Sequence, residues 1–261
     1  MGEMLAVAKA AAAVAILSGL MWASLGGPPA CPLPDGDVPD RIAALGADGV
    51  LRIHQRMEDA HVQLGARPGV AMVAPAWFGW VVAEPGRIAR VDDAGFELAS
   101  AASPPARAFA LDQDVLWVAT DGRLAAYDEH LQQLASIEVP VPRPATLLAW
   151  NHTLHVEGDG QSAAVDATEP RFPRLAADAP PRPAPGPRWA FVPADGGQAV
   201  GRVDGGRVLC RSAAVLADAG ALHPTDAVVL AGAGHEVVAM RSDGPVVLFA
   251  VPSPTVALAA Q

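Results

Sequence analysis

The chain of 261 residues carries a formal net charge of −10, and 51% of its residues are apolar. This length accommodates one large all-β domain. The negative charge excludes nucleic-acid binding and disfavours attraction to anionic lipid headgroups, because both of these partners are themselves negatively charged.

The first predicted element is an apolar run from Leu5 to Leu25 that is interrupted only by Lys9. As a helix this run would rise about 31 Å, which is enough to cross the hydrocarbon core of a bilayer. Trp22 lies near the distal end, where an indole suits the membrane interface. We therefore predict that residues 1–27 form a single membrane anchor. The residues that define this anchor are Leu5, Lys9, Leu17, Leu20, Trp22 and Leu25.

A cleaved signal peptide is the alternative for the same segment. Lys9 supplies the positive charge, and Ser24-Leu25-Gly26 is an acceptable cleavage site. Lipid attachment at Cys31 is disfavoured, because the preceding Pro28-Pro29-Ala30 lacks the aliphatic residue of a lipobox. In either case the charge distribution places the body outside the cytoplasm. We expect a single-pass protein of the bacterial cytoplasmic (inner) membrane, with its main domain in the periplasm or extracytoplasmic space.

Residues 28–40 are rich in proline and aspartate and are predicted to form an extended, semi-rigid linker. The rest of the chain, residues 41–261, is predicted to be one domain built from repeats. Its repeat signal is a series of glycine-centred turns at Gly49, Gly86, Gly122, Gly160, Gly206 and Gly244. The intervals are 37, 36, 38, 46 and 38 residues, and each turn opens a short apolar run. A period near 40 indicates supersecondary units that stack to bury their apolar faces.

The units consist of strands, so the repeat predicts a six-bladed β-propeller after the membrane helix. In the third unit, Asp114–Ala119 alternates as a strand, Thr120-Asp121-Gly122 turns, and Arg123–Asp128 returns. Thr255–Ala259 is the candidate closing strand, which would complete the unit that begins near Arg41 and remove the open sheet edges. The 46-residue interval indicates one insertion, Arg174–Arg188, whose five prolines predict an exposed loop or polyproline segment.

Residues 54–64 (HQRMEDAHVQL) are weakly helical in pattern, and we interpret them as the outer strand of the first unit. The second and third units share the pattern aliphatic-Trp-Val-x-x-(Asp/Pro)-Gly-Arg-aliphatic-x-x-(Val/Tyr)-Asp. This pattern resembles the blades of the broad propeller group with NHL, YVTN and PQQ-like repeats, over about residues 41–258. The resemblance implies architecture only, because the functional motifs of that group are missing from the sequence.

Two cysteines, Cys31 and Cys210, suggest a disulfide in an oxidising compartment, which would tie the linker to the propeller. Closing so long a loop would stabilise the fold by around 4 kcal/mol in the chain-entropy model. The alternative is a buried, unpaired Cys210 and a free Cys31. No Cys-x-x-Cys-His motif occurs, which excludes covalently attached c-type haem.

The remaining polar residues show no catalytic or metal-binding pattern. His152 and His155 lie three positions apart across a turn or strand, where they point to different faces. The aspartates of Asp35-Gly36-Asp37 and Asp112-Gln113-Asp114 lack the other ligands of a calcium loop and match turn chemistry instead. Recurring aromatic residues from Trp77 to Trp189 indicate packing between blades, and a ligand-stacking rim is the alternative.

These observations favour a non-enzymatic, membrane-anchored propeller that acts as an accessory or scaffolding subunit of an integral membrane protein complex. No cofactor, metal or catalytic residue is expected. The alternative is an exported enzyme or a sugar-type ligand-binding protein that uses the central funnel of the propeller. That alternative is supported by analogy of fold alone.

Overall fold

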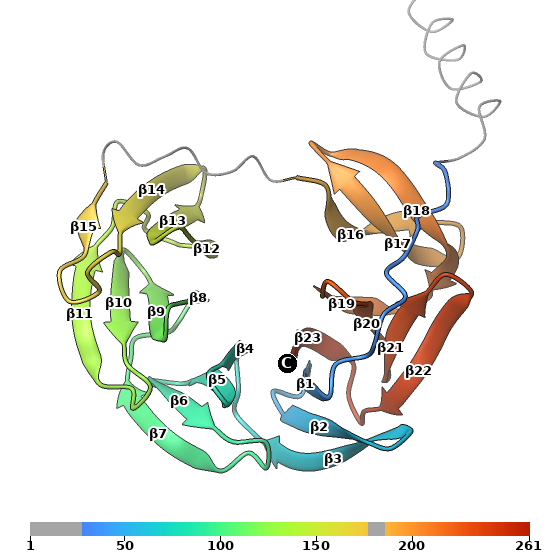
Figure 1. The fold of residues 1–261 in the computed structure, drawn as a ribbon, viewed down its shortest axis with the longest axis horizontal. Helices are drawn as coiled ribbons and strands as arrows, with labels where there is room; N and C mark the ends of the chain where they lie inside the picture. Colours follow the sequence, from blue (N-terminus) through green and yellow to red (C-terminus); the bar gives the residue numbers. More distant parts are fainter. Residues whose placement is uncertain (1–27, 177–185) are drawn as a thin grey trace, which may run out of the picture.

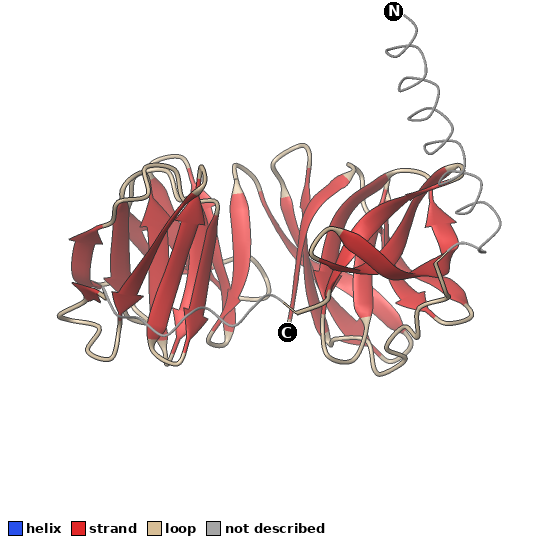
Figure 2. Cartoon of the chain, turned by 90° about the horizontal axis from the view of Figure 1, so that it is seen from above, coloured by secondary structure: helices blue, strands red, loops and turns tan. Residues whose placement is uncertain are grey.

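The structure is a computed structural model that describes residues 28–176 and 186–261. Six antiparallel sheets are arranged around a central axis, as in a β-propeller (Figure 1). Seen edge-on, the strands run between two faces on which the turns gather (Figure 2). We number the sheets one to six in chain order. The predicted anchor, Leu5–Leu25, lies outside the described residues. In the described part, no helix is long and apolar enough to span a bilayer.

The first three sheets each contain four strands. The first sheet has the order β23 (Thr255–Ala260), β1 (Arg41–Gly46), β2 (Leu51–Met57), β3 (Ala60–Arg67). The second has β4 (Met72–Ala76), β5 (Gly79–Glu84), β6 (Arg87–Val91), β7 (Glu97–Ala102). The third has β8 (Ala108–Asp112), β9 (Val115–Thr120), β10 (Arg123–Tyr127), β11 (Gln133–Glu138).

Among the described residues, the fifth sheet has three strands, whereas the other sheets have four. The fourth sheet has β12 (Thr146–Trp150), β13 (Thr153–Gly158), β14 (Gln161–Asp166), β15 (Arg174–Leu175). The fifth has β16 (Arg188–Ala194), β17 (Gly197–Asp204), β18 (Arg207–Leu216). The sixth has β19 (Ala219–Pro224), β20 (Val229–Ala233), β21 (Glu236–Arg241), β22 (Gly244–Ala250).

The closing strand is where the sequence places it. β23 pairs with β1, with Ile42 opposite Ala260 and Ala44 opposite Leu258. The first sheet therefore takes its innermost strand from the far end of the chain, and this prediction is confirmed. The segment 54–64, predicted as the outer strand of the first unit, is extended but divided: it forms the end of β2, a turn at residues 58–59 and the start of the outer strand β3.

Hydrophobic clusters fill the spaces between neighbouring sheets. Trp80 lies fully buried between sheets one and two, and Trp117 lies fully buried between sheets three and four. Similar clusters join sheets two and three, five and six, and six and one. Within the described residues, no such cluster joins sheets four and five, which stand apart in Figure 1.

The regular repeat places the turn of the fifth sheet at Gly196, not at Gly206 as predicted. In sheets one to four, the glycine turn joins the second strand to the third, as Gly160 joins β13 to β14. In the sixth sheet the same position is held by Gly234, not by Gly244. With Gly196 and Gly234 the intervals become 37, 36, 38, 36 and 38 residues. The predicted 46-residue interval arose because Gly160 joins a second strand to a third, whereas Gly206 joins a third strand to a fourth.

This alignment identifies the three strands of the fifth sheet as the second, third and outermost strands of a blade. β16 contacts β19, which is the innermost strand of the following sheet. The second strands β1 and β20 make the same kind of contact, with β4 and β23. The second strands of the other sheets are almost fully buried, whereas β16 is mostly half-buried or exposed. In the described part of the chain, β16 pairs with a strand on one side only.

Candidate functional site

Residues 28–40, which we call the strap, cross one face of the ring before the first strand begins (Figure 1). A disulfide joins Cys31 to Cys210 on β18. The backbone around it is also paired, because Cys31 N–H donates to the Arg211 carbonyl and Arg211 N–H donates to the Pro29 carbonyl, each at 3.0 Å. The strap is thus fixed to the fifth sheet by one covalent and two hydrogen bonds.

The strap is then held against the sixth sheet. Gly36 N–H donates to the Ala227 carbonyl at 2.7 Å, and Arg241 pairs with Asp35 at 2.6 Å. A Cβ on Gly36 would lie 2.9 Å from the Ala227 oxygen, so only glycine allows this approach. Leu33 is buried in the cluster between sheets five and six. The predicted semi-rigid linker is therefore a docked segment.

The face that carries the strap, which we call the strap face, consists of two sets of turns. These turns join the first strand of each sheet to the second, and the third strand to the fourth. Ala227 lies in the first kind of turn, between β19 and β20, and Arg241 ends β21 at the second kind. Because the strap contacts both kinds, it runs along this face on its way to Arg41.

The exposed aromatic side chains gather on the strap face. In the described part of the chain, four aromatic side chains rank as exposed, and all four lie in or next to turns of this face. They are Phe78 (84% exposed), Phe96 (71%), Phe172 (66%) and Trp150 (52%). Met57, at the end of β2, is 53% exposed on the same face. Packing between blades accounts for Trp80 and Trp117, but it does not account for these five side chains.

The turn that presents Phe78 is held rigidly. Trp77 has a positive φ of 50°, which is rare for a bulky residue and requires support from its surroundings. Its indole N–H donates to the Asp114 carbonyl at 3.2 Å, and the Arg90 guanidinium lies 5.3 Å from the ring centroid. Arg90 in turn donates to the Glu129 carbonyl at 2.8 Å. The backbone at Phe78 is therefore fixed by contacts of its neighbour, Trp77, to the third sheet.

A polar contact on the same face joins the third and fourth sheets. His152 lies 3.5 Å from Asp112, and its other ring nitrogen lies 3.0 Å from the Gln113 amide nitrogen. His155, three residues on, lies in β13 and has a buried Nε2 without a hydrogen-bond partner. The two histidines do not converge, and no group of three metal-binding side chains occurs in the described residues. Asp35 and Asp112, considered as calcium ligands, instead pair with Arg241 and His152.

An acidic hollow lies where the strap meets the first and sixth sheets. Its volume is about 590 Å³, and it opens on the strap face. Asp37, Asp40 and Asp226 line it together with Arg56. With three carboxylates against one guanidinium, this hollow favours cationic groups.

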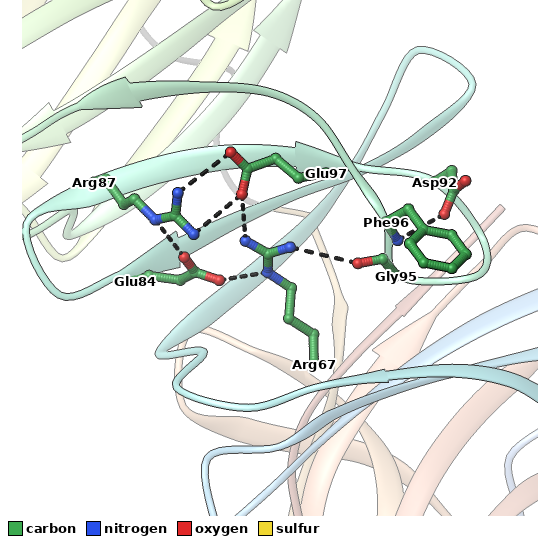
Figure 3. A network of polar contacts seen from close by, with 7 residues as sticks. All are labelled: Arg67, Glu84, Arg87, Asp92, Gly95, Phe96 and Glu97. Carbon is green, nitrogen blue, oxygen red and sulfur yellow. Dashed lines mark hydrogen bonds and ion pairs between the residues drawn. The ribbon is translucent and has the colours of Figure 1, made fainter.

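Away from the strap, a network of charges joins the first and second sheets (Figure 3). Arg67 forms salt bridges with Glu84 and with Glu97, and the distance to Glu97 is 2.8 Å. Arg87 forms a salt bridge with Glu84 at 2.7 Å. The hydrogen bond from Arg67 lowers the pKa of Glu97 to about 2. Each charge in this network is paired with another, so the network fastens two sheets and leaves no group free for catalysis.

The predicted site residues fall into two groups. The structure brings Cys31 and Cys210 together, whereas the anchor residues from Leu5 to Leu25 lie outside the described part of the chain. Sequence reasoning missed the gathering of Phe78, Phe96, Trp150 and Phe172 on one face. The sequence held a local signal, since each of these residues lies next to a glycine, asparagine or proline typical of turns. The side of the ring, however, is assigned only by the strand order.

The sequence matches no protein-family model, and it matches none of the curated proteins. The fold is similar to that of a protein of unknown function from Bacteroides caccae, with a TM-score of 0.50 and 15% identity over 85% of this chain and 98% of that chain. A computationally designed protein, Ika8, has a TM-score of 0.45 and 16% identity, covering 86% of this chain and 76% of its own. At this identity, the similarity to the Bacteroides caccae protein concerns the fold alone.

Proposed function

We propose that this protein is a six-bladed β-propeller on a single N-terminal transmembrane helix, and that it is a non-catalytic accessory or scaffolding subunit of an integral membrane protein complex. The propeller lies on the periplasmic side of the bacterial inner membrane. The strap is the observation that carries this proposal, because it connects the apolar segment to one defined face of the ring.

The length of the connection restricts the distance between that face and the bilayer. Five residues separate Leu25 from Cys31, which is bonded to β18. An extended chain spans at most about 3.6 Å per residue, so Cys31 lies within roughly 20 Å of the end of the anchor. A propeller held this close, with its strap face toward the bilayer, is positioned to contact other membrane proteins. The disulfide agrees with an oxidising compartment.

Purification of the full-length protein from membranes in mild detergent tests the proposal. We expect the intact N-terminus by mass spectrometry, retention in the membrane fraction after washing with alkaline carbonate, and a stoichiometric integral membrane partner. A mature N-terminus near Gly26 in a soluble, monomeric protein would refute the proposal. Measurable binding of a small sugar by that monomer would support a ligand-binding role for the central funnel instead.

A further inference from the structure

We infer that the strap face docks on the extracytoplasmic surface of an integral membrane protein, and that the exposed aromatic side chains of its turns make the central contacts. This inference rests on the proposed function, and it adds the surface and the chemistry of the partner. The partner surface has apolar pockets bordered by lysine and arginine side chains.

The first support is the distribution of apolar side chains. Single exposed hydrophobic residues are normal on any protein. Here, however, every exposed aromatic residue of the described chain lies on the same face, the strap face. Aromatic residues are enriched at the centres of protein interfaces, where they fill pockets of the partner. Phe78 and Trp150 lie nearest the axis, at turns of innermost strands, and Phe96 and Phe172 lie at outer turns.

The second support is preorganisation. The turn of Phe78 is fixed through Trp77, which bonds to Asp114 and contacts Arg90. The loop that ends at Phe96 is closed by Asp92, whose carboxylate accepts the N–H groups of Ala94 and Phe96 at 2.9 Å. Turns held in place lose little backbone freedom on binding, so less of the contact energy is offset by ordering.

The third support is charge, which distinguishes a protein partner from lipid. The acidic hollow formed by Asp37, Asp40 and Asp226 opens on the same face, and the whole chain has a net charge of −10. Anionic lipid headgroups repel such a surface, whereas basic side chains of a protein complement it. The acidic hollow lies beside the strap, on the face that also carries the aromatic side chains, and it favours a protein surface over the bilayer itself.

The strap also raises the effective concentration of the docking face. Because Cys31 is bonded to β18 and lies within about 20 Å of the anchor, the face is confined to the layer next to the bilayer that it shares with other membrane proteins. Contacts of modest intrinsic strength are then sufficient for a stable complex. The docking face and the tether act together, and each can be tested separately.

Photo-crosslinking in intact membranes tests the docking face directly. A photoreactive benzoylphenylalanine replaces Phe78, Phe172 or, as the control, Val247, which is 53% exposed and lies on the outer strand β22. We expect the same integral membrane protein to be linked from positions 78 and 172, at a yield at least tenfold above that from position 247. Links to lipid alone, or equal yields at the three positions, would overturn the inference.

Substitutions provide the second measurement. In the full-length protein, Phe78→Ser combined with Phe172→Ser is expected to reduce the co-purifying membrane partner at least tenfold, whereas Val247→Ser leaves it unchanged. Both variants are expected to keep the circular dichroism spectrum and the membrane fractionation of the parent. A double variant that stays in the membrane and retains its partner overturns the docking inference alone. A chain released to the soluble fraction by processing overturns the proposed function as well.

Discussion

Acid is expected to destabilise this fold through one buried histidine, His54. The ring of His54 stacks on Phe249 with centroids 3.7 Å apart and an interplanar angle of 12°, at the interface of the first and sixth sheets. Neither ring nitrogen has a hydrogen-bond partner. Burial, followed by the nearby His61 and Arg52, lowers the pKa of His54 from 6.5 to about 4.

The sign of the effect follows from this lowered pKa. Between pH 6.5 and about 4 the unfolded chain binds a proton at His54 and the folded chain does not, so stability falls as the pH falls. The complete shift corresponds to roughly 3 kcal/mol at 1.36 kcal/mol per pH unit. Between pH 7.5 and pH 5, His54 alone therefore accounts for a loss of about 2 kcal/mol in the free energy of unfolding.

Urea unfolding followed by tryptophan fluorescence measures this difference at the two pH values. His54→Phe preserves the stacked ring and removes the titrating group, so the loss between pH 7.5 and pH 5 is expected to shrink by about 2 kcal/mol. A smaller dependence remains, because burial also lowers the pKa of His223. His130→Phe, at an exposed site, is the matched control for replacing a histidine by phenylalanine. An equal pH dependence in parent and His54→Phe would refute this account of His54.

Three further predictions concern the strap and the charge network. Cys31→Ser is expected to free the N-terminal half of the strap and to lower the melting temperature. Limited proteolysis within residues 28–34 measures the release, and the parent protein treated with reductant should behave in the same way. Gly36→Val places side-chain atoms against Ala227, so hydrogen exchange at residues 34–38 should increase, while Gly186→Ala, which meets nothing within 4 Å, leaves it unchanged. Glu84→Gln removes the carboxylate that two arginines share and is expected to cost about 1–3 kcal/mol in urea unfolding, with no change in partner binding.

The repeat could be predicted from the sequence because its signals are local. The strand predicted at Asp114–Ala119 is observed as β9, Val115–Thr120, and the predicted turn at Gly122 has a positive φ. Both signals depend on chemistry within a few residues. The closing strand β23 was also predictable, since the repeat left one strand unassigned at the end.

The sequence did not show which glycine turn of the fifth and sixth units joins the second strand to the third. Gly205-Gly206 and Asp243-Gly244 have the same turn chemistry as Gly196 and Gly234, and each of these glycines has a positive φ. Only the pairing of strands separates turns between second and third strands from turns between third and fourth strands. For the same reason the sequence did not indicate which aromatic residues share a face, because that depends on strand direction around the whole ring.

The pairing of β23 with β1 gives this protein an order of assembly. The first sheet is incomplete until Thr255–Ala260 has been synthesised, although β1 leaves the ribosome more than two hundred residues earlier. The Cys31–Cys210 bond likewise waits for a cysteine 179 positions downstream. A chain that stops early therefore exposes the edge of β1 and leaves Leu45 without Ala257 opposite it. Such fragments carry an unfinished sheet edge that chaperones and proteases can distinguish from the finished ring.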